Sequence, residues 1–364
     1  MKILSIFGTR PEAIKLAPVL SQLNKHEVHS IVCVTAQHRE MLDQVLALFA
    51  IQPHYDLALM QPNQSLAALT ARALTKLDEV LRMEKPDWVL VQGDTTTAMV
   101  GALAAFYHQI KVGHVEAGLR SFDKYQPFPE EINRKMASSV SDLHFAPTEV
   151  SRQNLLREGV PEDNIVVTGN TVIDALLQVA AQPYDWDASP LAVIPRDKRI
   201  ILVTAHRREN FGAPLQNICA ALRTIAERYA DVHLVYPVHL NPNVQTVVRE
   251  MLGDIANITL LSPLEYLPLV QLLKQSYLVV TDSGGIQEEA PGLGKPVLVL
   301  REVTERPEGV TAGKVKLVGT DQDKIVCEVE LLLTDQAEYD RMARAVNPYG
   351  DGQASQRIVT KLLS

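Results

Sequence analysis

The alternation of apolar and amphipathic segments in the first half of the chain predicts a parallel α/β domain. Short runs of apolar and β-branched residues, without polar alternation, are typical of strands that are buried on both faces of a sheet. Between them lie longer segments with apolar residues at helical spacing. The expected strands are residues 2–7, 28–34, 87–91, 111–115, 143–145 and 165–167, and the expected helices are 11–23, 39–49, 65–83, 95–107, 130–139, 148–157 and 171–181. Strands and helices in this order favour a doubly wound parallel sheet.

The same alternation restarts after residues 182–197, a segment with several prolines and little periodicity that is typical of a crossing between domains. Further strands are expected at 199–204, 232–236, 258–260, 277–281, 296–300 and 315–318, and late helices at 321–333 and 337–346. A last helix that ends at Leu363 carries Ile358, Val359, Leu362 and Leu363 on one face, and we expect it to pack on the first domain. We therefore predict an α/β protein of two Rossmann-like doubly wound domains facing across a cleft, with residues 1–170 and 351–364 in one and 171–350 in the other.

Length and composition agree with two globular domains and narrow the class of partner. The 364 residues are 46% hydrophobic and 21% charged, which suits two domains of about 150 to 200 residues with full cores. A net charge of −8 disfavours a nucleic-acid partner, so an anion site must be a local arrangement of cations and helix ends. The apolar start is cut short at Gly8, which predicts no signal peptide, and no segment reaches the ~18 apolar residues of a membrane span. Three scattered cysteines indicate core residues of a reducing compartment, so we expect a cytoplasmic protein.

The strongest candidate site follows the expected strand 277–281. Asp282 and Ser283 are residues that often cap helices, and Gly284 and Gly285 would let a ligand approach the backbone before a short helix begins near Ile286. A helix N-terminus at the carboxyl edge of a parallel sheet is a common phosphate site. The acids Glu288 and Glu289 could accept hydrogen bonds from a ribose diol, and the charged run 301–308 follows the next strand. We interpret this segment as a diphosphate site; the alternative is a plain strand–turn–helix junction.

Polar residues follow several other expected strands. Arg10 and Lys15 follow the first strand, Asp94 and Glu116 follow two later ones, and the polar run 204–210 follows the first strand of the second domain. Taken alone, Asp94 could be a helix cap and Lys15 a solvated helix residue. Because the carboxyl ends of parallel strands meet at one edge of a sheet, the set as a whole indicates a site.

A proline-bounded loop at residues 125–129 opens a helix with Glu130, Glu131 and Arg134 near its start. Acids there ordinarily match the helix dipole, but either Glu130 or Glu131 would supply a third carboxylate if this helix start lies in the cleft. No Gly-x-Gly-x-x-Gly sequence opens a helix after a strand, and the histidines are scattered without metal-ligand spacing. We therefore expect neither a nicotinamide or flavin cofactor nor a metal.

These polar motifs resemble those of the non-hydrolysing bacterial UDP-N-acetylglucosamine 2-epimerases, in order and over essentially the whole chain. The matching segments are GTRPE at 8–12, QGDT at 92–95, EAGLR at 116–120, PFPEEINR at 127–134, TAHRREN at 204–210 and DSGGIQEE at 282–289. The resemblance implies a GT-B fold and interconversion of UDP-N-acetylglucosamine with UDP-N-acetylmannosamine, a precursor for surface polysaccharide. One difference is Ala205, where glycine is common in the family.

The resemblance also implies roles for individual residues. UDP would be held by Arg10, His206, Ser283, Gly284, Gly285 and Glu289, with His206 also assisting catalysis, and Asp94, Glu116 and Glu130 would be the catalytic acids. We also expect Lys15, Glu131, Arg134 and Arg306 to bind substrate. A second, regulatory UDP-N-acetylglucosamine would contact Gln37, Arg207, His239 and Glu40, the last of which replaces a glutamine of the family. The family expectation is a homodimer through the first domain.

The chemistry of the reaction agrees with these residue types. The C2 proton of a nucleotide sugar is not acidic, so inversion at C2 requires either oxidation at C3 or departure of the C1 substituent. Departure of UDP needs a cationic cradle and a carboxylate that removes the C2 proton, and it leaves a 2-acetamidoglucal to which UDP adds back. The residues do not assign individual acids to the two faces of C2. Two alternatives remain: a GT-B glycosyltransferase, which would need an acceptor pocket, and a non-catalytic UDP-sugar sensor, which has no use for three carboxylates.

Overall fold

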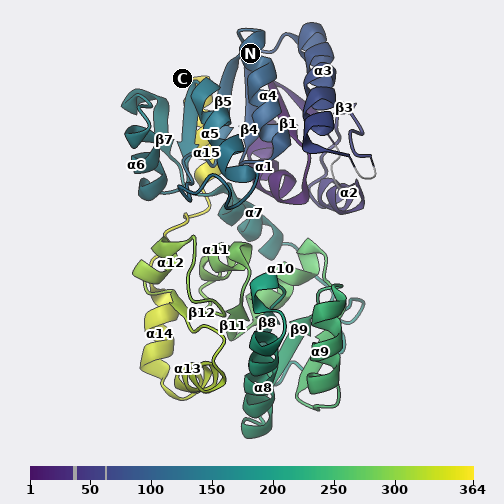
Figure 1. Ribbon diagram of the computed structural model, residues 1–364, viewed down its shortest axis with the longest axis vertical. Helices are drawn as coiled ribbons and strands as arrows, with labels where there is room; N and C mark the ends of the chain where they lie inside the picture. The colour runs from purple at the N-terminus through teal and green to yellow at the C-terminus, as the bar shows by residue number, and fades with distance from the viewer. Residues whose placement is uncertain (36–38, 62–63) are drawn as a thin grey trace. The chain divides into compact units, whose positions relative to one another are not determined.

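The computed structural model describes residues 1–35, 39–61 and 64–364, and its contacts divide the chain into two units (Figure 1). The first unit comprises Met1–Ala175 and Gly350–Ser364, and the second comprises Leu176–Tyr349. The chain leaves the first unit within helix α7 (Thr171–Ala180). This point precedes residues 182–197, where we predicted that the chain crosses between the domains.

The described strands of the first unit form a seven-stranded parallel sheet in the order β3-β2-β1-β4-β5-β6-β7. The strands are β1 Lys2–Phe7, β2 His29–Val34, β3 Tyr55–Asp56, β4 Trp88–Gln92, β5 Lys111–Val115, β6 Leu143–Ala146 and β7 Ile165–Val167. The helices are α1 Arg10–Leu23, α2 Arg39–Leu48, α3 Leu66–Glu84, α4 Thr96–Tyr107, α5 Glu130–Val140, α6 Glu149–Arg157 and α7, with a short 3₁₀ turn η1 at Glu162–Asn164. Strand β3 was not expected, because two residues are too few to form a recognisable apolar run.

The second unit has a six-stranded parallel sheet in the order β10-β9-β8-β11-β12-β13. Its strands are β8 Arg199–Thr204, β9 Val232–Pro237, β10 Ile258–Leu261, β11 Leu278–Thr281, β12 Val297–Val299 and β13 Val315–Leu317. Its helices are α8 Ala213–Arg228, α9 Pro242–Leu252, α10 Tyr266–Gln275, α11 Gly284–Gly292, α12 Pro307–Thr311, α13 Gln322–Thr334 and α14 Gln336–Arg344, with a 3₁₀ turn η2 at Arg208–Asn210. The prediction of two doubly wound parallel sheets is confirmed.

Each sheet has one point where the strand order reverses direction. In the first unit this point lies between β1 and β4, and in the second unit between β8 and β11. Loops that leave the carboxyl ends of strands on either side of such a point diverge and leave a crevice for a ligand. The loops in question begin at Gly8 and Gly93 in the first unit and at Ala205 and Asp282 in the second.

The strands are held in place by apolar packing on both faces of each sheet. In the first unit, helix α4 packs so closely on the sheet that a Cβ atom added at Gly101 would lie 3.1 Å from Val91 Cγ1. Cys33 and Cys219 lie in the core as expected, and burial raises the pKa of each thiol to about 12. Cys327 was also expected in the core but is exposed on α13.

The last helix, α15 (Ala354–Leu363), belongs to the first unit, as predicted. Ile358, Val359 and Leu362 are buried, and α15 packs against α1. Asp174 anchors the start of the helix, because its carboxylate accepts hydrogen bonds from the backbone of Ala354 and Ser355 at 3.2 and 2.8 Å.

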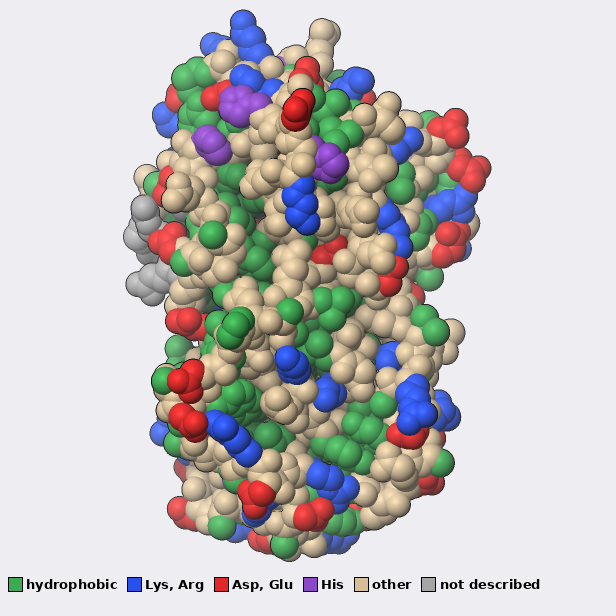
Figure 2. Space-filling view, turned by 180° about the vertical axis from the view of Figure 1, so that it is seen from behind, with side chains coloured by type: hydrophobic (Ala, Val, Ile, Leu, Met, Phe, Trp, Pro, Cys, Tyr) green, Lys and Arg blue, Asp and Glu red, His purple; other side chains and the backbone are tan. Residues whose placement is uncertain are grey.

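The surface carries both signs of charge. On the face that Figure 2 shows, acidic and basic side chains are interspersed. Within the ranges that the structure describes, no helix combines the length and apolar character that crossing a membrane requires.

Candidate active-site residues

Asp94 lies at the switch point of the first sheet, in the loop between β4 and α4. Its carboxylate forms an ion pair with Arg134 of α5. The alternative role as a helix cap belongs instead to Thr95, whose hydroxyl accepts a hydrogen bond from Ala98 N at 3.1 Å. Asp94 is partly exposed and therefore remains accessible to a ligand.

Glu116, directly after β5, is a buried carboxylate surrounded by donors. It pairs with Lys15 of α1 and accepts hydrogen bonds from Gln92 Nε2 at 2.5 Å and Asn170 Nδ2 at 2.9 Å. The side chain of Lys15 is only 16% exposed, so it is not the solvated helix residue of the alternative interpretation. Glu116 has φ of 64°, which is uncommon for a residue with a side chain and persists only where surrounding contacts hold it.

Glu130 and Glu131 are neighbours at the start of α5 but have different surroundings. Glu131 is fully buried, and its carboxylate accepts hydrogen bonds from the backbone N–H groups of Ser121 and Phe122 at 3.0 and 3.2 Å and from Arg134 at 3.3 Å. Glu130 is partly exposed, and its side chain makes no hydrogen bond or ion pair with residues that the structure describes. Of the two, Glu130 is therefore better placed to act on a substrate.

The β1–α1 loop is organised by Glu12, a residue that the sequence interpretation missed. The buried carboxylate accepts hydrogen bonds from Gly8 N and Thr9 N at 3.0 and 2.7 Å and from the Thr95 hydroxyl at 2.6 Å. Burial raises the pKa of Glu12, while these hydrogen bonds act in the opposite direction. The signal was present as a capping box, because Thr9 caps α1 and Glu12 stands three residues later. Arg10 begins α1, and among the described residues its side chain has no ion-pair partner.

At the switch point of the second sheet, Asp282 binds the loop that follows β8. Its Oδ2 atom accepts hydrogen bonds from His206 N and Arg207 N, both at 2.8 Å, and from Asn210 Nδ2 at 3.0 Å. We expected Asp282 or Ser283 to cap α11, and Ser283 is the N-cap residue, although its side chain makes no capping hydrogen bond. Asp282 does not cap the helix, because its carboxylate binds the loop after β8.

Helix α11 begins at Gly284, two residues before the expected start at Ile286. A Cβ atom at Gly284 would lie 2.6 Å from Arg306 Nη1, so the guanidinium occupies space that only glycine leaves open. At Gly285 the nearest such contact is Glu289 Oε2 at 3.9 Å. The first N–H groups of α11, next to a guanidinium, form a suitable anion site.

Two buried acids follow on α11. Glu289 accepts a hydrogen bond from the Tyr266 hydroxyl at 2.9 Å, which orients its carboxylate. Glu288 pairs with Arg306 Nε at 2.5 Å. Tyr266 lies on α10, and no local sequence pattern predicts its contact with Glu289.

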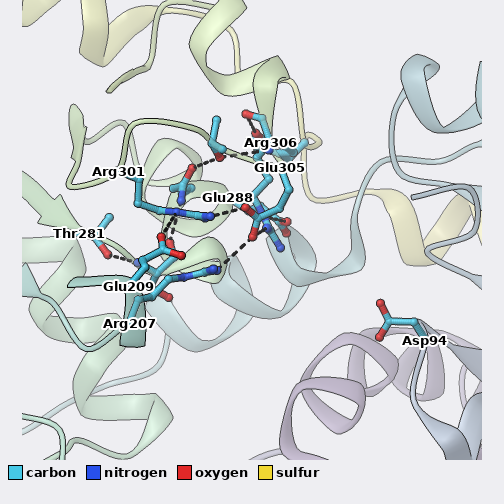
Figure 3. A network of polar contacts seen from close by, with 12 residues as sticks. Asp94, Arg207, Glu209, Thr281, Glu288, Arg301, Glu305 and Arg306 are labelled. Atoms are coloured by element: carbon cyan, nitrogen blue, oxygen red, sulfur yellow. Dashed lines mark hydrogen bonds and ion pairs between the residues drawn. The ribbon is translucent and has the colours of Figure 1, made fainter. Parts of the chain in front are cut away.

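The charged run 301–308 forms a network around Glu305 (Figure 3). Glu305 pairs with Arg207, Arg301 and Arg306 at 3.0, 2.6 and 2.9 Å, and Arg301 also pairs with Glu209 at 2.8 Å. Burial would raise the pKa of Glu305, but Arg306 and Arg301 outweigh it and lower the pKa to about 2. The network therefore keeps several guanidinium groups together beside the start of α11.

His206 lies beside the two residues of the expected regulatory set that the structure describes in full. Its ring centroid is 5.4 Å from that of His239, and Arg207 follows it in the chain. Gln37 lies outside the described residues, and of Glu40 only the backbone position in α2 is described. The residues that the structure describes include no group of three or more His, Cys, Asp or Glu side chains that could hold a metal ion.

Comparison with known proteins gives consistent matches over the whole length. The family model described as UDP-N-acetylglucosamine 2-epimerase matches residues 21–363. The UDP-N-acetylglucosamine 2-epimerase of Escherichia coli K12 is 57% identical over 369 residues, covering 100% of this chain and 98% of that protein. The crystal structure of UDP-GlcNAc 2-epimerase from Neisseria meningitidis bound to UDP-GlcNAc has a TM-score of 0.89 at 50% identity and covers 100% of both chains. The S. aureus MnaA-UDP co-structure has a TM-score of 0.87 at 51% identity and covers 99% of this chain and 95% of that one.

Proposed function

The chain belongs to the UDP-N-acetylglucosamine 2-epimerase family, and from this premise we propose that it interconverts UDP-N-acetylglucosamine and UDP-N-acetylmannosamine by elimination and re-addition of UDP. It has the GT-B-like architecture of its structural relatives, with two parallel α/β units, and it is an isomerase. The observation that carries the proposal is the placement of Asp94, Glu116 and Glu130 on separate loops and helix ends of one unit.

UDP is held by the second unit. The N–H groups at Gly284 and Gly285, with Arg306 beside them, offer donors and positive charge to the diphosphate. Glu289, oriented by Tyr266, offers carboxylate oxygens to the ribose hydroxyls. Ser283, in the loop after β11, and His206, in the loop after β8, also belong to the proposed nucleotide site.

The first unit supplies the acids and bases. As the C1–O bond breaks, its electron pair leaves with UDP, a carboxylate takes the C2 proton, and a C1=C2 double bond forms. Re-addition of UDP at C1 and return of a proton to the opposite face of C2 complete the inversion. More than one carboxylate is needed because the proton leaves one face and returns to the other. Lys15 holds Glu116 and Arg134 holds Asp94 by ion pairs, and Glu131 supports Arg134. Arg10, at the start of α1, offers a further cation to UDP.

Regulation and assembly follow the same family assignment. Arg207 and His239 would contact a second UDP-N-acetylglucosamine, since Arg207 follows His206 in the chain and the His239 ring lies 5.4 Å from that of His206. The other two residues of the expected regulatory set are Gln37 and Glu40. A homodimer through the first unit is supported by the exposed side chains of Phe106, Tyr107 and Met83 at the ends of adjacent helices α4 and α3. We place the protein in the cytoplasm, where its product would serve surface polysaccharide synthesis.

Proton NMR of UDP-N-acetylglucosamine with the purified protein in D₂O tests the function. The expected result is a growing mannosamine isomer that carries deuterium at C2. A glycosyltransferase would give no isomer from this substrate alone, and a sensor would bind UDP without turnover. Retained UDP binding with no isomer would therefore overturn the proposal.

A further inference from the structure

We propose that Asp282 is a positioning residue that fixes the tautomer of His206, keeping the proton on Nδ1 and directing Nε2 to the diphosphate. This inference rests on the proposed function, because it takes His206 as a neighbour of bound UDP. It concerns a carboxylate that touches no substrate atom and acts through the imidazole.

The first observation is an unsatisfied oxygen on a fully buried carboxylate. Asp282 Oδ2 accepts hydrogen bonds from His206 N, Arg207 N and Asn210 Nδ2. The other oxygen, Oδ1, is buried and has no hydrogen-bond partner among the residues that the structure describes. Burying a carboxylate oxygen without a hydrogen-bond donor costs free energy, so we expect a donor to reach this oxygen.

The second observation is that the nearest imidazole is already held close to this oxygen. His206 Nδ1 lies 3.9 Å from Asp282 Oδ1, and the backbone N–H of the same histidine is bound to Oδ2. A shift of about 1 Å of the ring would give a normal hydrogen bond. Such a contact selects the tautomer with hydrogen on Nδ1, because a carboxylate only accepts.

The charges that face the ring explain why the tautomer matters. Burial lowers the pKa of His206, Asp282 opposes this, and His239 and Arg207 lower it further. The imidazole is therefore neutral near neutral pH when no ligand is bound, and only one ring nitrogen carries a proton. When the diphosphate binds, its negative charge favours the imidazolium. Nδ1–H then donates to Asp282 and Nε2–H to the leaving phosphate oxygen.

The competing explanation is that Asp282 has a purely structural role. A variant of Asn210 distinguishes this explanation from control of the His206 tautomer. Asn210 Nδ2 donates to Asp282 Oδ2 and, at 3.3 Å, to Leu300 O, so it anchors the same loop without contacting Oδ1. Asn210→Ala loosens the anchor and leaves the carboxylate facing His206. Asp282→Asn can keep an oxygen towards the backbone amides but turns an NH₂ group towards Nδ1, which then has to accept, so the other tautomer is favoured.

The test is long-range ¹H–¹⁵N NMR of the histidine side chains in the full-length protein, with the His206 signals assigned by their loss in His206→Asn. We expect the Nδ1–H tautomer in the free protein, a doubly protonated ring with saturating UDP, and the Nε2–H tautomer in Asp282→Asn. We also expect kcat of Asp282→Asn to fall at least 10-fold while KM changes less. Asn210→Ala should keep the wild-type tautomer.

Three results would overturn the inference: an Nε2–H tautomer in the wild-type protein, an unchanged tautomer in Asp282→Asn, or equal losses of kcat in Asp282→Asn and Asn210→Ala. If Asp282→Asn does not fold, the wild-type tautomer still decides. A wild-type protein with the expected tautomer but no epimerisation would refute the proposed function and leave the Asp282–His206 pairing in place.

Discussion

Breaking the ion pair between Lys15 and Glu116 should destabilise the first unit far more than breaking an exposed pair on the same unit. The two side chains are 16% and 6% exposed, so solvent screens their attraction weakly. Removing one partner of a buried pair typically costs about 3–5 kcal/mol, because the other charge remains buried. Gln92 and Asn170 continue to donate to Glu116, so we expect the lower end, about 3 kcal/mol, for Lys15→Met.

A double-mutant cycle with Lys15→Met and Glu116→Gln isolates the pair. We expect a coupling energy of about 2 kcal/mol, from the range for residues in direct contact. The control cycle is Arg152→Met with Glu162→Gln, a pair whose acid is 72% exposed and which should couple by about 0–1 kcal/mol.

Urea unfolding followed by tryptophan fluorescence measures both cycles. The chain has two tryptophans, Trp88 in β4 of the first unit and Trp186 in the second. A Trp186→Phe background therefore reports on the first unit alone. A coupling between Lys15 and Glu116 no larger than that between Arg152 and Glu162 would refute the view that the pair is held in a poorly screened site.

Four further outcomes are expected. His206→Asn should lower kcat/KM by the equivalent of about 1.5–3 kcal/mol of activation free energy, the scale of a charge-assisted hydrogen bond to the leaving group. Unchanged kinetic constants would show that the histidine does not act at the site. Substrate labelled with ¹⁸O in the C1–O–P bridge should exchange the label into non-bridging β-phosphate positions if bound UDP can rotate, and retention of the bridge during rapid turnover would count against elimination. Asp94→Asn, Glu116→Gln and Glu130→Gln should each slow turnover at least ~10²-fold in steady-state assays. Glu305 has a folded pKa of about 2, below the ~4.3 of an unfolded glutamate, so its stabilisation is present above about pH 4.3 and is lost as the pH falls towards 2. Because the side chain is 43% exposed, we expect the free energy of unfolding to fall by about 1 kcal/mol over this pH range. Glu305→Gln should reduce this pH dependence in urea-unfolding experiments, and an unchanged pH dependence would contradict the role given to Glu305.

The parts of the fold that the sequence predicted are those with local signals. Runs such as residues 199–204 are apolar because parallel strands are buried on both faces, so most strands were placed within a residue or two. Asp94 and Glu116 were found because loops at the carboxyl ends of such strands meet at one edge.

The contacts that the sequence did not predict join residues far apart in the chain. Asp282 was expected to cap a helix, but its partners are backbone groups of residues 75 and 76 positions earlier. Tyr266 and Glu289 are 23 positions apart, and neither belongs to a pattern that specifies the other. A local rule gives the residue types that a loop needs, whereas the partner of each carboxylate depends on tertiary packing.

The return of the chain to the first unit makes the second unit an insertion within a host domain. The chain leaves the host after Ala175 and re-enters it at Gly350. Asp174 binds the start of α15, and a Cβ atom at Gly350 would lie 3.4 Å from Asn170 N, so both cut ends of the host are held close together. The entropic cost of closing a loop grows only slowly with the length of the loop. Replacing the inserted domain by a short linker should therefore change the stability of the host domain little. A chain in which residue 175 is joined to residue 350 by a few residues should therefore fold as an isolated host that keeps its three carboxylates and lacks the nucleotide-binding insert.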